Sequence, residues 1–143
     1  MKKLFLVLLI IVQACMAFAQ NFSVDESVYA SVDIPPHYLN GGDKGLLSDL
    51  YTIISETAPV SQDSVKGRAA VSFSVSKDGQ IDTGSIKVIR NRSVPDDYLK
   101  AAIEAIKKLG KFEPGKQLGT PKRVTYTIPV IYPAPLEYIK TNE

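Results

Sequence analysis

The chain has 143 residues, with 17 Lys and Arg against 15 Asp and Glu, one His and one Cys. This length suffices for one folded core and is too short for two. The near balance of charge excludes the strongly basic field of a nucleic-acid-binding protein, and a single cysteine permits neither an internal disulfide nor a thiolate metal cluster.

The N-terminus has the pattern of a secretory signal peptide. Lys2 and Lys3 precede an apolar run over residues 4–12, and the Ala-Phe-Ala of residues 17–19 is a small-residue cleavage motif. Two alternatives stay open: acylation at Cys15, as in a lipoprotein, and a retained membrane anchor, for which the apolar run is short. Export without a disulfide predicts a periplasmic protein, either free or tethered by lipid.

Four segments are expected along the chain. They are a signal peptide over residues 1–19, an extended N-terminal arm over residues 20–33, one domain over residues 34–136 and a C-terminal tail over residues 137–143. Removal of the signal peptide takes away two lysines and leaves 15 basic against 15 acidic residues. The mature chain is therefore neutral overall, and no nucleic-acid partner is expected.

The start of the domain predicts a turn followed by an amphipathic helix. Residues 40–43 read Asn-Gly-Gly-Asp, a turn in which Asp43 is a plausible N-cap. Apolar residues then recur at three- and four-residue steps, as on the buried side of a helix that ends near Glu56. These residues are Leu46, Leu47, Leu50, Ile53 and Ile54. Residues 60–66 are expected to form a polar loop.

A β-hairpin is predicted next. In residues 71–76 apolar residues alternate with serines, so one face of the strand is expected to be apolar and the other polar. The Lys-Asp-Gly of residues 77–79 reverses the chain. On the return strand Ile81 is out of phase with Ile86, which predicts a bulge or break near residues 83–84.

The second predicted helix has the clearest ends. Pro95 and Asp96 open it and Gly110 closes it, with acidic residues in the first turn and lysines in the last. Its expected buried stripe consists of Leu99, Ala102, Ile103, Ile106 and Leu109.

The last strand, residues 124–132, has apolar or aromatic residues at its even positions. Pro129 lacks an N–H, which confines it to a sheet edge or a strand end. Connectivity rules place this strand beside the first hairpin strand, with its far side open. The expected fold class is α+β: a two-layer domain in which a three-stranded antiparallel or mixed sheet (hairpin, helix, edge strand) is covered on one face by two helices.

Few residues offer catalytic chemistry. His37 is the only histidine, which excludes a His-based metal site and leaves only a loop residue for a Ser-His-Asp triad. Asp96 and Asp97 are adjacent on a helix and do not face each other. The Gly-rich residues 40–45 lack the Gly-Lys-Ser/Thr ending of a phosphate-binding loop. We therefore expect binding rather than catalysis, with no cofactor and no metal.

Three motifs in order and at matching spacing resemble the TonB C-terminal domain family. Residues 67–81 are similar to the first hairpin of this family. Residues 112–116, Phe-Glu-Pro-Gly-Lys, resemble its aromatic-x-Pro-Gly-Lys loop, and residues 124–132 resemble its closing strand. Residues 35–42 are similar to the lead-in of the form common in Bacteroidetes-type bacteria.

The resemblance implies a role in energy transduction, in which the edge of the last strand takes up a short strand of an outer-membrane receptor. The protein-binding edge would then consist of Lys122, Arg123, Val124, Thr125, Tyr126, Thr127, Ile128, Pro129, Val130, Ile131 and Tyr132. The supporting loop would consist of Phe112, Pro114, Gly115 and Lys116, with Phe112 packed beneath it.

The expected function is that of a periplasmic binding module that recognises an extended peptide or receptor segment by β-strand addition, in TonB-dependent outer-membrane transport. Because no Pro-rich spacer follows the N-terminal segment, we expect a free or lipid-tethered module whose partner is a TonB-dependent receptor or another periplasmic protein. The alternative is a structural or assembly protein. It would pair with itself as a homodimer through the same edge, or bind cell wall through the basic residues Lys116, Lys122 and Arg123.

Overall fold

The structure, a computed structural model, describes residues 28–29, 32–58 and 65–140. The predicted signal peptide, Cys15 and most of the predicted arm and polar loop lie outside the described residues. The main elements are β1 (Val28–Tyr29), α2 (Gly42–Thr57), β3 (Gly67–Val75), β4 (Ile81–Arg92), α3 (Asp96–Lys107) and β8 (Arg123–Tyr132). Short elements connect them: β2 (His37–Tyr38), β5 (Phe112–Glu113), β6 (Lys116–Gln117), β7 (Thr120–Pro121) and the 3-10 helix η1 (Leu136–Tyr138).

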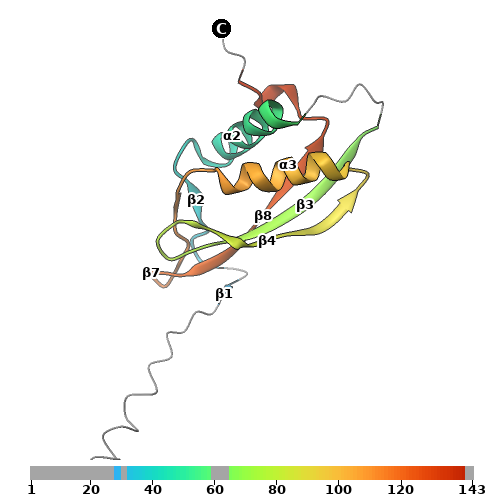
Figure 1. The fold of residues 1–143 in the computed structure, drawn as a ribbon. Helices are drawn as coiled ribbons and strands as arrows, with labels where there is room; N and C mark the ends of the chain where they lie inside the picture. Colours follow the sequence, from blue (N-terminus) through green and yellow to red (C-terminus); the bar gives the residue numbers. More distant parts are fainter. Residues whose placement is uncertain (1–27, 30–31, 59–64, 141–143) are drawn as a thin grey trace, which may run out of the picture.

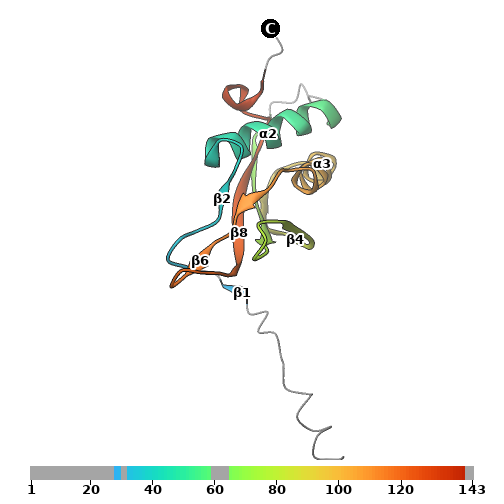
Figure 2. The same cartoon turned by 90° about the vertical axis from the view of Figure 1, so that its left-hand side faces the viewer.

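The strands form a sheet in the order β1-β8-β3-β4. Strand β3 runs antiparallel to both β4 and β8, whereas β1 is parallel to β8. Helix α3 crosses one face of the three long strands, and α2 lies beside it over one end of the sheet (Figures 1 and 2). The predicted α+β class and the position of the last strand beside the first hairpin strand are confirmed.

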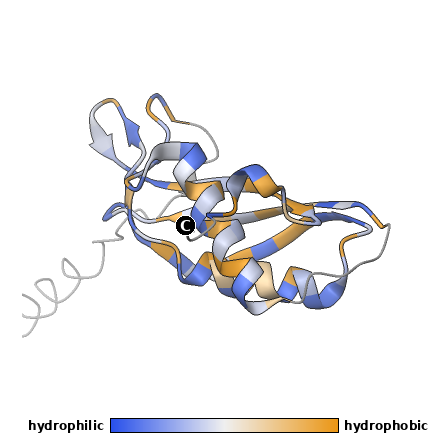
Figure 3. Ribbon diagram, turned by 90° about the horizontal axis from the view of Figure 1, so that it is seen from above, coloured by the Kyte–Doolittle hydropathy of each residue, from blue (hydrophilic) through white to orange (hydrophobic). Residues whose placement is uncertain are grey.

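The core lies between this sheet face and the two helices, as the periodicities predict. Alternate residues of β3 and β8 point to the helices, and they pack against the apolar sides of α2 and α3. Hydrophobic and hydrophilic residues alternate along the ribbon of the helices and strands (Figure 3). The large core side chains are Leu46, Leu50, Tyr51, Ile54, Val71, Phe73, Val75, Tyr98, Ile106, Phe112, Ile128, Val130 and Tyr132. Helix α2 is confirmed almost to the residue at its C-terminal end, and α3 follows its predicted bounds.

The N-terminus of α2 corrects one detail. The residue before the first turn is Gly41, with φ of +86° and no side-chain cap, so Asp43 is not the N-cap. Asp43 lies in the first turn, and one of its carboxylate oxygens accepts a hydrogen bond of 2.7 Å from the hydroxyl of Tyr126 in β8. This contact links the start of α2 to the middle of the last strand.

The predicted bulge is confirmed in place and is larger than expected. Between the pairs Ser72–Lys87 and Ser74–Asp82, β3 advances by two residues while β4 covers five. The hydroxyl of Ser85 fills the gap in the ladder by accepting a hydrogen bond of 2.7 Å from the Ser74 amide. A second register shift at Ile89 was not predicted.

The polar face of β3 is less exposed than alternation suggests. Ser72 and Ser74 are 1% and 6% exposed, respectively. Asp82 of β4 and Arg123 of β8 pair across β3 on this side of the sheet. We call the side of the sheet that is turned away from α2 and α3 the outer face.

The predicted C-terminal tail is part of the packed structure as far as residue 140. Tyr138 of η1 stacks on Tyr51 of α2, with ring centroids 5.8 Å apart. The ammonium of Lys140 lies 2.7 Å from a carboxylate oxygen of Asp49. Burial alone would raise the pKa of Asp49, but hydrogen bonds from Lys140, Asn40 and Tyr38 outweigh it and hold this pKa below its usual value.

Candidate functional site

The outward side of β8 is defined by its contacts with α2. The hydroxyl of Tyr51 accepts a hydrogen bond of 2.9 Å from the Ile131 amide and donates one of 3.3 Å to the Pro129 carbonyl. Backbone groups of alternate residues in a strand point to opposite sides, and β8 pairs with β3 on its other side. The odd-numbered residues of β8 therefore direct their backbone groups away from β3.

This orientation explains why Pro129 is tolerated within a paired strand. Its ring nitrogen lies on the side away from β3, so no ladder hydrogen bond is lost to the neighbouring Ala70. This geometry agrees with the prediction that Pro129 lies at a sheet edge or a strand end.

The first residues of the outward edge of β8 are not open, contrary to expectation. The short strand β1 pairs in parallel with it, with Val28 beside Arg123 and Tyr29 beside Val124. The last strand is thus the sheet edge only beyond the Thr125 amide. Sequence reasoning missed this pairing because a two-residue strand has no periodicity to detect.

The last residues of the outward edge of β8 are also closed, in this case by side chains. The hydroxyl of Tyr51 is bonded to the Pro129 carbonyl and the Ile131 amide, and the hydroxyl of Tyr98 in α3 donates a hydrogen bond of 2.9 Å to the Ile131 carbonyl. Burial raises the pKa of both tyrosines, so the hydroxyls remain protonated donors at neutral pH. Neither tyrosine was among the residues predicted for the buried sides of the two helices.

What remains is a short stretch that we call the open segment, residues 125–127 of β8. Thr125 and Thr127 share the parity of Ile131, so their amides and carbonyls point away from β3. The parallel bridge between Tyr29 and Val124 uses the Thr125 amide, which donates to the Tyr29 carbonyl. Within the described parts of the chain no strand or side chain pairs with the other three outward groups, which are the Thr125 carbonyl and the amide and carbonyl of Thr127. The open segment therefore offers one donor and two acceptors to another chain.

Phe112 occupies the predicted place beneath the loop that precedes β8. It is 2% exposed, and its ring makes edge contacts with those of Tyr38, Phe73 and Tyr126 at centroid distances of 5.1, 6.1 and 5.6 Å. Its amide donates a hydrogen bond of 2.8 Å to the Gly79 carbonyl of the hairpin turn. The aromatic residue thus joins the loop, the hairpin and the middle of the last strand.

The rest of the supporting loop is held by the segment that precedes α2. The backbone of Lys116 exchanges two hydrogen bonds with that of Ile34, of 2.8 and 3.1 Å. A side chain at Gly115 would lie 2.7 Å from Val124, so only glycine lets the loop lie this close to β8. The loop therefore sets the position at which β8 begins.

The predicted basic patch does not form a free cationic surface. Arg123 is paired with Asp82, and the ammonium of Lys116 lies 3.8 Å from a carboxylate oxygen of Glu113. The amide of Lys122 donates a hydrogen bond of 2.8 Å to the Gly115 carbonyl. Two of the three side chains are therefore already matched by acidic partners.

Comparison with known proteins agrees with this architecture. The family model described as the Gram-negative bacterial TonB protein C-terminal matches residues 61–133. No curated protein and no solved structure gives a significant match to the chain. Among the described residues, no helix is long and apolar enough to cross a membrane. The family match spans the hairpin, α3, the supporting loop and β8, and the chain therefore belongs to the TonB C-terminal family.

Proposed function

We propose that this protein is a periplasmic binding module that recognises an extended peptide, such as a receptor segment, by β-strand addition at the open segment of β8. Domains of the family are periplasmic, associated with TonB-dependent transport and non-enzymatic, and they interact with outer-membrane receptors. The observation that carries the proposal is the outward direction of three unpaired backbone groups, the Thr125 carbonyl and the amide and carbonyl of Thr127. Export through the predicted signal peptide belongs to the same proposal.

The size of the open segment limits what strand addition can achieve alone. Each backbone hydrogen bond contributes a net of about 0.5–1.5 kcal/mol, so three bonds offer about 1.5–4.5 kcal/mol. Association costs about 4 kcal/mol or more in lost translational and rotational freedom. A partner must therefore make further contacts, either by displacing β1 from Arg123 and Val124 or by using side chains next to the edge.

The experiment compares Thr127→Pro with Thr127→Val. The proline removes one outward N–H, whereas the valine keeps the backbone and changes only the exposed side chain. The probes are synthetic peptides that tile the N-terminal periplasmic segments of outer-membrane receptors, measured by fluorescence anisotropy. We expect peptide binding to be lost in Thr127→Pro and retained in Thr127→Val, with both variants folded by circular dichroism.

Strand addition at this edge would be refuted if folded Thr127→Pro bound the peptides as well as the wild type does. Self-pairing is measured in the same samples by gel filtration. A wild-type dimer that binds no receptor peptide and is split by Thr127→Pro would instead support an assembly role for the edge.

A further inference from the structure

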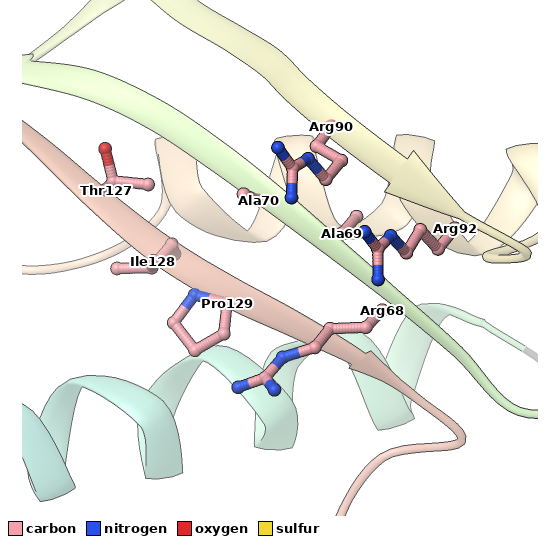
Figure 4. Close-up of a pocket in the computed structure, with 8 residues that line it drawn as sticks. All are labelled: Arg68, Ala69, Ala70, Arg90, Arg92, Thr127, Ile128 and Pro129. Carbon is pink, nitrogen blue, oxygen red and sulfur yellow. The ribbon is translucent and has the colours of Figure 1, made fainter.

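Three arginines lie together on the outer face at one end of the sheet. Arg68 of β3 is directly opposite Arg92 of β4, and Arg90 is opposite Ala70, so all three side chains belong to the same face. With Thr127 and Pro129 of β8 they line an open groove of about 480 Å³ (Figure 4). We call this site the arginine groove.

The charge of the arginine groove is not balanced within the described chain. None of the ion pairs found among the described residues involves Arg68, Arg90 or Arg92. In contrast, Arg123 on the same face is paired with Asp82. Like charges directly opposite each other destabilise a strand pair, so this arrangement favours the uptake of an anion. The planar guanidinium fork matches a carboxylate.

Arg68 connects the groove to the edge of β8. Its side chain extends across β8 toward α2, whereas Arg90 and Arg92 lie over β3 (Figure 4). Burial raises the pKa of Tyr51, and the positive charge of Arg68 opposes that rise, which agrees with a guanidinium near the Tyr51 hydroxyl. One end of the arginine groove therefore lies where Tyr51 closes the edge.

This geometry dictates the path of a chain paired with the open segment. Tyr51 occupies the edge at Pro129 and Ile131, so the added strand cannot continue there. Helix α2 covers the face of the sheet that packs against the core. The added chain can therefore continue only over the outer face, where the three arginines lie. Arg68 is opposite Ile131, which lies four residues beyond Thr127 in β8. Because every strand rises by about 3.3 Å per residue, an added chain reaches the level of Arg68 about four residues beyond its partner of Thr127.

We infer that the arginine groove binds the carboxylates of an acidic segment that flanks the strand added at the open segment. The partner is thus a polypeptide with Asp or Glu residues about two to six positions beyond its pairing residues. This inference rests on the proposed function, since the added strand delivers the acidic segment to the groove. The side-chain contacts of this acidic segment supply the additional affinity that three backbone bonds lack.

The experiment uses pairs of receptor-derived peptides that differ only in Asp and Glu against Asn and Gln in the flanking segment. They are measured with the wild type, with Arg68→Gln/Arg90→Gln/Arg92→Gln, and with a control of equal charge change, Lys77→Gln/Lys100→Gln/Lys108→Gln, whose three lysines are exposed. We expect the wild type and the lysine variant to bind the acidic peptide about tenfold more tightly than its amide form, a difference of about 1.4 kcal/mol. The arginine variant is expected to bind both forms equally.

Each other outcome is decisive. Equal binding of the two peptides by the wild type refutes the acidic partner but leaves strand addition intact, provided that Thr127→Pro abolishes both. A preference that survives in the arginine variant places the carboxylate elsewhere on the protein and also refutes the inference. Absence of binding by any peptide overturns the proposed function together with it. Vesicles of phosphatidylcholine and phosphatidylglycerol are a further probe: arginine-dependent vesicle binding without a peptide preference would assign the groove to a lipid surface instead.

Discussion

The assignment of the open segment depends on Tyr51, and Tyr51→Phe tests it directly. The tyrosine is fully buried, and its hydroxyl is the partner of the Ile131 amide and the Pro129 carbonyl. Phenylalanine keeps the ring and its stacking on Tyr138 but removes both hydrogen bonds. The variant should therefore change the edge without changing the shape of the core.

The magnitude follows from the two bonds. The bond of 2.9 Å to Ile131 has good length, whereas that of 3.3 Å to Pro129 is long. One good hydrogen bond and an amide left without its partner amount to about 1–2 kcal/mol. In a domain of this size we expect the melting temperature to fall by about 4–10 °C.

The assay combines urea unfolding with amide hydrogen exchange followed by NMR. Exchange of the Ile131 amide should become about tenfold faster relative to the core amides of β3, while the Thr127 amide exchanges rapidly in both proteins. Tyr138→Phe is the matched control, since it removes a hydroxyl from the stacking partner of Tyr51 and should leave Ile131 protected. If Ile131 stayed equally protected in Tyr51→Phe, the odd-numbered amides would not face outward, and the open segment would be wrongly assigned.

Three further predictions concern the scaffold of the site. Ser72→Ala should leave the free energy of unfolding, measured by urea titration, unchanged or raise it by up to about 1 kcal/mol. The reason is that the buried Ser72 hydroxyl has no hydrogen-bond partner among the described residues. A decrease of more than about 1 kcal/mol would show that the hydroxyl makes a hydrogen bond. Gly79→Ala should lower the free energy of unfolding by more than about 2 kcal/mol, because φ is +79° and the added methyl would lie 1.9 Å from the Phe112 carbonyl oxygen. A variant as stable as the wild type would contradict the close approach of the hairpin turn to the supporting loop. The free energy of unfolding should fall as the pH rises above about 10, because burial raises the pKa of Tyr51 and Tyr98 in the folded state above the unfolded value of 10.0. Above that pH the folded state holds protons that the unfolded state releases. A free energy of unfolding that stays constant from about pH 9 to 11 would contradict this.

The positions of both helices, the hairpin and the inward face of the last strand could be read from the sequence. In each of these segments apolar residues recur at a fixed period, which is 3.6 residues in α2 and α3 and two residues in β3 and β8. The pattern therefore shows directly which side of each element is buried. Pro129 added the direction of one backbone group, because a residue without an N–H cannot sit on the paired side. The expected edge strand and the supporting role of Phe112 followed from such local signals and from the family resemblance.

The limits of the open segment were decided only in the tertiary structure. Tyr51 lies 80 positions from Ile131 in the chain, and β1 lies even farther from Arg123. Neither contact leaves a repeat or a spacing in the local sequence. The arginine groove likewise depends on the register shift at Ile89, which brings Arg90 and Arg92 to the same face as Arg68. Periodicity along a segment determines which face is buried, whereas the partners that close an edge or gather charges are chosen by packing between segments that are distant in sequence.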